Sequence, residues 1–389
     1  MKIGIVTNLF PPIQTGSSFW ARELAASLAA EGDEVVVITC GFESKATIEE
    51  YGKVIVYRLP VIMPLPQINL FLNFEQFYLL SSAANRDRMK SIFREHRIEV
   101  VHQCGQLLDS ILMTRKVCRQ MRLPSVCSIH TKIFHPGNQL YDLCFRIVDR
   151  VILRNLVINQ FDLLMPLDDV LAKYATSIYG CERLAIVPVC MDSQTLQELP
   201  AEPSVSGNPL HIVSIGHVTE MRSRKELLVA LAALKCSGYD FRLTIVGKVL
   251  TNKTQNLIDV LGLTDNVALK GEVPRAQLFN LLRSAHIEAH WLDIPGIGSA
   301  AMEAMAIGLP VVTYGYEGLY GDVPLRHGEN IMFIDPKSPD TILKALQTLV
   351  ESPELRKQIG RNARRLVQEH LTWSVVIKKV RSLYQEVIG

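Results

Sequence analysis

The sequence predicts an α/β protein made of two doubly wound parallel sheets. Short apolar runs alternate with amphipathic helical patterns, which is typical of βαβ units. This alternation stops in a stretch rich in Pro, Ser and Gly and then starts again. A chain of 389 residues is also longer than the domains that usually form around a single hydrophobic core. We therefore expect two domains of the same class.

The first half opens with an apolar run at 2–7, a Pro/Gly loop, a helical pattern at 19–30 and a second apolar run at 34–39. Strand, loop, helix and strand in this order predict parallel pairing, because the crossover returns the chain in the same direction. The same reasoning predicts further strands at 98–102, 124–129 and 161–165.

The second half repeats this pattern after a linker at 196–210. We expect strands at 211–216, 241–247 and 267–271, and a helix at about 224–236. The last segment has a helical pattern with one apolar face, which should pack along a domain. The predicted domains are 1–198 and 209–372, followed by a C-terminal helix at 373–389.

Composition narrows the class of protein. The chain is 48% hydrophobic and 21% charged with a net charge of +2, which is ordinary for a globular enzyme and predicts no nucleic-acid partner. The eight cysteines show no metal-finger spacing and suit buried free thiols in a reducing cytoplasm. The sequence has no signal-peptide pattern and no apolar run of about 18 residues, so we expect a cytoplasmic location.

One segment suggests contact with a membrane. Residues 68–80 are mostly apolar and are followed by a basic stretch at 86–97. This order is typical of a peripheral patch on the inner face of a membrane. A core helix with a solvated basic end is the alternative interpretation.

The turn Gly296-Ile297-Gly298-Ser299 is the first candidate binding feature. Glycines let a phosphate approach the backbone, and the start of the following helix favours anions through its free amides. Glu303 follows one turn later on the same helix face as Ser299, where its carboxylate could accept hydroxyl protons from a ribose. Since Gly-x-Gly alone is common, an ordinary helix with a solvated Glu303 is the alternative.

The stretch from Pro295 to Val312 reads PGIGSAAMEAMAIGLPVV and resembles the donor motif of family 4 glycosyltransferases, usually EGFGxxxxEAMAxGxPVV. Further landmarks follow in the family's order from the first βαβ unit to Trp373. The resemblance implies the GT-B fold, with two Rossmann-like domains facing across a cleft and a C-terminal helix that crosses back to the first domain. It also implies retaining transfer of a hexose, such as glucose, from a nucleotide diphosphate sugar, with a UDP-sugar favoured, to a polysaccharide or a lipid-linked acceptor.

The resemblance also assigns donor-binding positions in the second domain. The family's diphosphate-binding Arg and Lys correspond to His217 and Arg222, of which Arg222 can clamp a diphosphate with two parallel hydrogen bonds. Gly247 corresponds to a further landmark, and Glu272 and Val273 to the wall that contacts the base.

In the first domain, His130 ends a predicted strand and corresponds to the family's active-site histidine, which faces the donor sugar. Gly16 and Ser17 correspond to the loop that approaches the donor phosphates and acceptor. The candidate catalytic set is therefore His130, Arg222 and Glu303. In the family the donor β-phosphate takes the acceptor proton, so Arg222 and the helix amides would stabilise the leaving diphosphate.

Two positions depart from the family's pattern. Pro295 replaces the first Glu of the Glu-x7-Glu pair, which contacts the sugar ring, and Asp293 is the candidate substitute. The segment His286-Ile287-Glu288-Ala289-His290 is not H-E-x-x-H, and its alternation predicts a strand with one polar face. Because the family needs neither a metal nor another cofactor, we expect none here.

Two other functions are compatible with parts of the sequence. Pro295 and His217 would suit a catalytically weakened scaffold that binds nucleotides or sugars. A nicotinamide-dependent oxidoreductase would share the doubly wound sheet, but the sequence lacks G-x-G-x-x-G after its first strand. The transferase accounts for more of the residues than either alternative.

Overall fold

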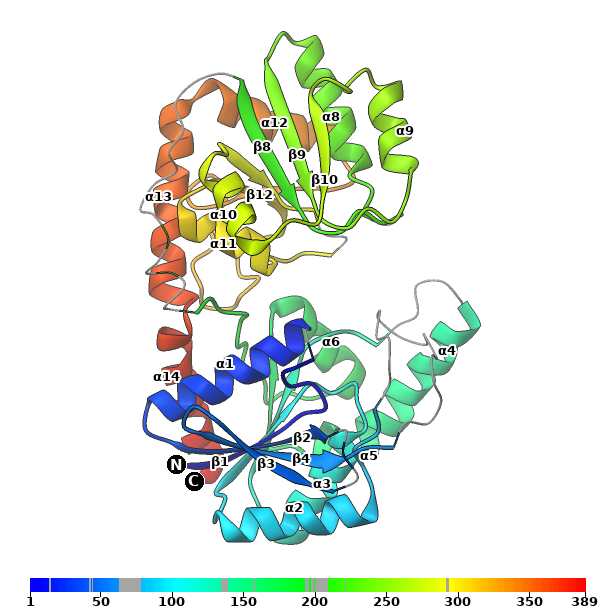
Figure 1. Cartoon of the computed structure of the whole chain (residues 1–389), viewed down its shortest axis with the longest axis vertical. Helices are drawn as coiled ribbons and strands as arrows, with labels where there is room; N and C mark the ends of the chain where they lie inside the picture. Colours follow the sequence, from blue (N-terminus) through cyan, green and yellow to red (C-terminus); the bar gives the residue numbers. More distant parts are fainter. Residues whose placement is uncertain are drawn as a thin grey trace. The chain divides into compact units, whose positions relative to one another are not determined.

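A computed structural model describes the chain except for residues 14, 42, 44, 63–77, 134–138, 157, 193–195, 197, 198, 200–208, 221, 292 and 293. The chain forms two compact units (Figure 1). The first contains Met1–Val189 and Trp373–Gly389, and the second contains Cys190–Thr372. The division therefore precedes the predicted boundary at 198. Residues next to it join the second unit because Met191 forms a parallel bridge with Thr372.

The first unit contains a seven-stranded sheet in the order β3-β4-β2-β1-β5-β6-β7. All neighbours are parallel except β3 and β4, which form an antiparallel hairpin at one edge. This hairpin was not predicted, because β3 is mostly exposed and has no alternating pattern. The strands are β1 (Lys2–Val6), β2 (Glu34–Gly41), β3 (Thr47–Tyr51), β4 (Val54–Pro60), β5 (Val100–Cys104), β6 (Ser125–Ile129) and β7 (Leu163–Pro166).

The helices of the first unit follow the strands as crossovers, apart from α14, which returns from the end of the chain. Helix α4 continues into a π-helical segment, η1, and then into short α5 and 3₁₀ turns. They are α1 (Gly16–Ala30), α2 (Ala83–Glu95), α3 (Ser110–Met121), α4 (Gln139–Ile147), η1 (Val148–Leu153), α5 (Arg154–Leu156), η2 (Ile158–Gln160), α6 (Asp169–Tyr179) and α14 (Trp373–Ile388).

The second unit contains a six-stranded, fully parallel sheet in the order β10-β9-β8-β11-β12-β13. Its strands are β8 (Leu210–Ile215), β9 (Phe241–Val246), β10 (Val267–Gly271), β11 (Ile287–Ala289), β12 (Val311–Tyr314) and β13 (Met332–Ile334). Its helices are α8 (Lys225–Cys236), α9 (Lys253–Val260), α10 (Arg275–Arg283), α11 (Ser299–Ile307), α12 (Pro339–Glu351) and α13 (Pro353–His370). Two doubly wound α/β sheets are the fold class that the sequence predicts.

Helix α14 is held against the first sheet by aromatic and polar contacts. Trp20 of α1 lies edge-on to Trp373, with ring centroids 5.6 Å apart. The Tyr384 hydroxyl lies 2.5 Å from His102 Nδ1 in the core. Burial lowers the pKa of His102 to about 3, so the ring is neutral at physiological pH.

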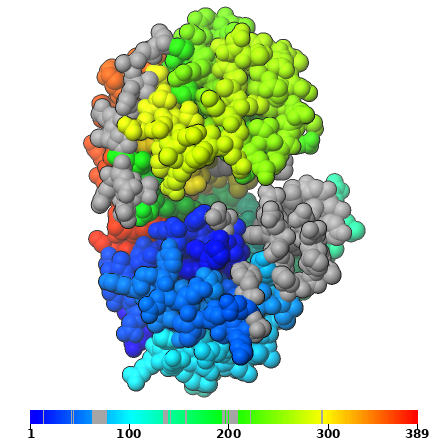
Figure 2. All heavy atoms as spheres, viewed as in Figure 1, coloured from blue at the N-terminus to red at the C-terminus, as the bar shows by residue number. Residues whose placement is uncertain are grey.

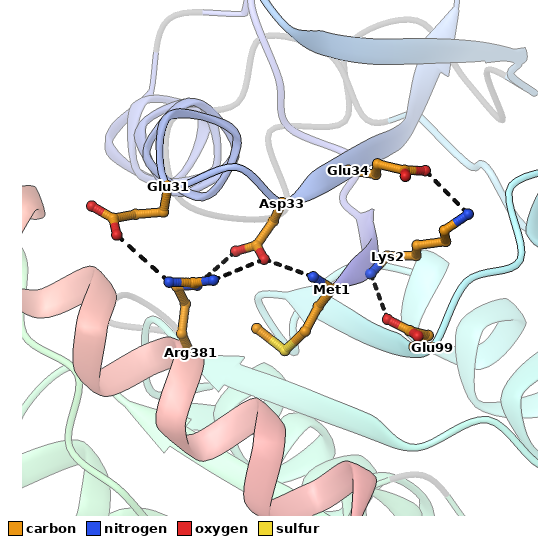
Figure 3. Close-up of polar contacts among 7 residues, drawn as sticks. All are labelled: Met1, Lys2, Glu31, Asp33, Glu34, Glu99 and Arg381. Carbon is orange, nitrogen blue, oxygen red and sulfur yellow. Dashed lines mark hydrogen bonds and ion pairs between the residues drawn. The ribbon is translucent and has the colours of Figure 1, made fainter.

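An ion-pair cluster around Arg381 also holds α14 against the first unit. Arg381 lies between Glu31 and Asp33, at 3.5 Å and 2.9 Å, and the Met1 amino group lies 2.8 Å from the same Asp33 carboxylate (Figure 3). The Asp33 side chain is only 1% exposed, and the two cations offset the free-energy cost of burying its negative charge. The two ends of the chain therefore lie side by side.

The cysteines are all free, but they are not all buried. Cys40, Cys104, Cys118 and Cys127 are buried, whereas Cys144 and Cys236 are exposed. The expectation of buried thiols is wrong for the two exposed residues. Cys144 lies on the outward side of α4, and Cys236 is the last residue of α8, where spacing alone did not reveal exposure.

We expect Tyr384→Phe to lower the free energy of unfolding of the first unit by about 1–3 kcal/mol, because His102 Nδ1 would lose its partner in a buried site. Denaturant titration followed by circular dichroism measures the change. Tyr51→Phe, at a hydroxyl on a side chain that is 42% exposed, is the matched control. Equal midpoints for the two variants would contradict the expectation.

Candidate functional site

The strand order of the second unit reverses between β8 and β11, which are neighbours although two strands separate them in sequence. Ligands of open α/β sheets bind outside the carboxyl ends of the strands at such a switch point. The predicted donor residues follow β8, β9, β10 and β11 and so share this edge of the sheet. Atoms of the segment from α10 to α11, in yellow, form a patch on the unit's surface (Figure 2).

The loops after β8 and β9 touch through their glycines. A Cβ at Gly247 would lie 2.4 Å from the carbonyl oxygen of Gly216, and the φ angles of 141° and 133° are ones that only glycine adopts readily. Both glycines are therefore needed for the backbone to close here. The close approach accounts for a glycine at position 247 without requiring that this residue contact a ligand.

Arg224 organises the loop after β8 and was missed by the sequence analysis. Its fully buried guanidinium donates to the carbonyls of Gly216, His217 and Arg222 at 2.8–3.1 Å, and to Ser214 Oγ. A basic run such as 222–225 usually lies in solvent at the start of a helix, yet Arg224 within it is fully buried. The pattern RSRK gave no sign of which cation is buried.

The two predicted diphosphate contacts lie on this loop. His217 is exposed, and its Nδ1 accepts the backbone N–H of Lys248 at 3.1 Å, which places the proton of a neutral ring on Nε2. Arg222 is half-buried, and its backbone N–H donates to Thr219 Oγ1 at 3.0 Å. The loop therefore holds one imidazole donor and one guanidinium near the carboxyl end of β8.

The turn before α11 is fixed by β12 and by the turn that follows this strand. Tyr320 exchanges hydrogen bonds with both backbone groups of Ile297, and Thr313 donates to the carbonyl of Gly296 at 3.1 Å. Gly298 is the N-cap of α11, and no side chain in the described part of the chain caps the helix. Ser299, the first helical residue, is exposed. The first amides of α11 are thus held in place and available to an anion.

Glu303 is only 16% exposed, so the alternative of a solvated carboxylate is wrong. Arg275, at the start of α10, donates to Glu303 Oε1 at 3.1 Å. Burial raises the pKa of Glu303, and the Arg275 charge partly offsets that rise. The same contact brings the predicted base wall, with exposed Glu272 and half-buried Val273, next to α11.

The predicted polar face of the strand at 286–290 is not solvated. Glu288 on the buried β11 and His290 directly after it are 0% and 5% exposed, with His290 Nδ1 at 3.2 Å from Glu288 Oε1. Position 293, the candidate sugar contact Asp293, lies outside the described residues, and Pro295 is half-buried. Within the described part of the chain, no cluster of three His, Cys, Asp or Glu could hold a metal.

The first unit brings three predicted residues together. Gly16 opens α1, Ser17 Oγ lies 3.1 Å from His130 Nδ1, and His130 Nε2 lies 2.8 Å from Ser128 Oγ. Trp20 packs edge-on against the His130 ring at 4.8 Å. The sequence did not point to Trp20, whose place in the helix resembles any core position.

His130 is held as a neutral ring. It is half-buried at the end of β6, and its backbone N–H donates to Gln106 Oε1 at 3.2 Å. Burial lowers the pKa of His130 to about 4. Since both ring nitrogens face serine hydroxyls, which can donate or accept, either neutral tautomer is accommodated. The ring can therefore serve as a hydrogen-bonding group but not as a standing positive charge at neutral pH.

These features define a class of protein: an α/β protein of two Rossmann-like units, of which the second combines a helix start open to an anion with the largely buried carboxylate of Glu303. Two family models cover most of the chain. Residues 15–194 match the model for glycosyltransferase family 4, and residues 197–366 match that for glycosyl transferases group 1. The chain belongs to the family 4 glycosyltransferases and has the GT-B fold.

Individual relatives agree with this assignment. An MMP α-(1→4)-mannosyltransferase of Mycolicibacterium hassiacum is 25% identical, with 100% of this chain and 99% of the relative covered. Among solved structures, Anabaena HepE in complex with UDP aligns with a TM-score of 0.67 at 16% identity, covering 99% of this chain and 100% of that one. Sucrose-phosphate synthase of Thermosynechococcus elongatus aligns at 0.68 and 17% identity, over 100% and 99% of the two chains.

We expect the His130 ring to stay neutral from pH 8 down to about pH 5, because burial lowers its pKa to about 4. The ring proton and carbon shifts, followed by NMR and assigned by their loss in His130→Gln, report this directly. A midpoint near the ordinary value of about 6.5 would show that the ring is solvated.

Proposed function

We propose that the chain is a retaining hexosyltransferase that takes its sugar from a nucleotide diphosphate sugar, with UDP-glucose as the favoured donor. The acceptor is a saccharide of a cell-surface polysaccharide or a lipid-linked intermediate. The observation that carries the proposal is the start of α11, where uncapped amides lie one turn from a buried carboxylate. Family membership and the similarity to a mannosyltransferase support the reaction class.

The donor fits the chemistry of this edge of the second sheet. Diphosphate oxygens would accept from the first amides of α11, and Arg222 would add a bidentate contact. Glu303 would accept the ribose hydroxyls with the oxygen that Arg275 leaves available. A helix-end anion contact contributes about 0.3–1 kcal/mol at an exposed site, and a hydrogen bond to a charged group about 1.5–3 kcal/mol.

The reaction uses groups that the chain can supply without a metal or another cofactor. The β-phosphate takes the acceptor proton, while Arg222 and the α11 amides stabilise the charge that develops on the leaving diphosphate. His130, as a neutral ring, hydrogen-bonds to the sugar or the phosphate rather than pairing with it electrostatically. With Pro295 in place of a carboxylate, the sugar ring is held by other groups, for which Asp293 is the candidate.

We expect one of UDP, GDP and ADP to raise the unfolding midpoint of the chain, because a ligand at about 100 times its dissociation constant adds about 2.7 kcal/mol. Glu303→Gln should remove most of this shift, since the amide has one accepting oxygen and cannot accept from both Arg275 and the ribose hydroxyls. Release of UDP from UDP-sugars by the unmodified chain distinguishes a transferase from a nucleotide-binding scaffold.

Glu354→Gln is the matched control, because this glutamate lies on the surface of the same unit with its side chain 80% exposed. It should leave the shift unchanged. If no nucleotide moves the midpoint of the unmodified chain, the transferase proposal fails. If nucleotides bind and no sugar is released or transferred, the weakened scaffold takes its place.

We also propose that the protein works in the cytoplasm, with its first unit against the inner face of a membrane. The sequence pointed to 68–80, but residues 68–77 lie outside the described residues. No helix among the described residues is long and apolar enough to cross a membrane. A different element supports the contact: α4 and η1, which extend from the edge of the first unit.

The helical run formed by α4 and η1 buries a charged side chain and exposes apolar ones. Asp149 is 2% exposed and accepts hydrogen bonds from Tyr179, at 2.7 Å, and Tyr174 of α6. Leu143, Ile147 and Val151, spaced four residues apart, are 53–57% exposed. An apolar stripe of this kind marks a membrane or protein contact. The exposed cations Arg146 and Arg150 on this run, and Arg154 at the start of α5, favour anionic lipid.

We expect the chain to cosediment with phosphatidylglycerol vesicles and about tenfold less with phosphatidylcholine vesicles. The triple variant Leu143→Gln, Ile147→Gln, Val151→Gln should lose this binding. Its matched control carries Gln at Ile48, Leu250 and Val260, three aliphatic residues that are equally or more exposed elsewhere. A dimer that the first triple variant abolishes, in place of vesicle binding, would assign the stripe to a second copy of the chain.

A further inference from the structure

The middle strand of the second sheet carries two ionisable side chains where apolar ones are usual. Strand β11 pairs with β8 on one side and β12 on the other, and such strands are normally apolar on both faces. Ile287 and Ala289 satisfy that rule and join the core cluster. Glu288 and His290, which alternate with them, point to the opposite face and are 0% and 5% exposed.

The two side chains form a pair that is only partly satisfied. His290 Nδ1 lies 3.2 Å from Glu288 Oε1, while Glu288 Oε2 and His290 Nε2 are buried without a hydrogen-bond partner among the described residues. Each such buried polar atom costs about 1–3 kcal/mol. Packing of the sheet alone therefore does not account for a Glu and a His at these positions.

The free edge of the His290 ring lies against the start of α11. A Cβ at Gly298 would be 2.6 Å from His290 Nε2 and 3.1 Å from its Cε1. The Gly298 backbone, with φ of −70° and ψ of 169°, is extended and open to any residue. The ring, and not the backbone conformation, is therefore what requires glycine at this position.

We infer that Glu288 and His290 are positioning residues for the donor site: the carboxylate fixes the imidazole, and the imidazole fixes Gly298 and with it the first amides of α11. This inference rests on the proposed function, because it gives those amides the donor diphosphate as their ligand. Neither side chain touches the ligand. A shift of the ring changes the direction of the amides while the helix itself stays formed.

The test uses the clash at position 298. Gly298→Ala pushes the new methyl group against the ring and should weaken nucleotide diphosphate binding by about tenfold or more. The double variant Gly298→Ala, His290→Ala removes the ring and should recover most of that loss. Glu288→Ala in the Gly298→Ala background should recover part of it, because the ring is then able to turn aside.

The kinetic pattern separates positioning from a general loss of structure. Displaced amides should raise KM for the nucleotide sugar several-fold, whereas a merely misfolded fraction lowers the apparent kcat at unchanged KM. Gly4→Ala is the matched control, because its Cβ would lie 2.9 Å from the Phe93 ring in the first unit. It should lower the unfolding midpoint and leave nucleotide affinity unchanged.

Each result has a defined meaning. If Gly298→Ala binds nucleotide like the unmodified chain, or if removing the ring recovers nothing, the inference is overturned. If the unmodified chain binds no nucleotide, the proposed function fails, and the coupling between 298 and 290 is then read from the unfolding midpoints. If the stability changes of Gly298→Ala and His290→Ala simply add in the double variant, the two residues are not in contact and the inference is overturned.

Discussion

Parallel strands that are buried on both faces leave little room for polar side chains along their length, so most of the polar groups that a ligand could use stand at the carboxyl ends of the strands. In the second unit this constraint collects segments from distant parts of the sequence, from His217 after β8 to the turn before α11. In the first unit it brings the start of α1 to His130 after β6. The chemistry of each unit is therefore a consequence of its sheet.

Loops at these edges need support from below, and in each unit a large side chain supplies it. Trp20 packs against His130, His102 and Trp373, so one indole backs the predicted active-site histidine and receives the returning helix α14. Arg224 has the corresponding place under the loop after β8 and satisfies carbonyls that would otherwise be buried without a donor. A side chain that touches no substrate can thus decide where a contacting residue lies.

Periodicity predicted most strands, because buried parallel strands read as apolar runs, and it predicted the helices α1, α8 and α14, whose apolar faces repeat. It missed the β3–β4 hairpin, where an exposed edge strand carries no pattern. The donor turn and Glu303 were found from the order of Gly, helix formers and Glu along the chain. Arg275, which pairs with Glu303, comes from a different helix and left no signal near the motif.

The sequence by itself determined the fold class, the family and the turn that opens α11, since all three depend on residues that are close together in the chain. Only the tertiary structure decided which ionisable groups are buried. Arg222 and Arg224 are two residues apart, yet the first is half-buried and the second is fully enclosed. Glu288, predicted to lie on the polar face of a strand, is fully buried. Burial depends on what the rest of the chain packs around a side chain, and no local pattern carries that information.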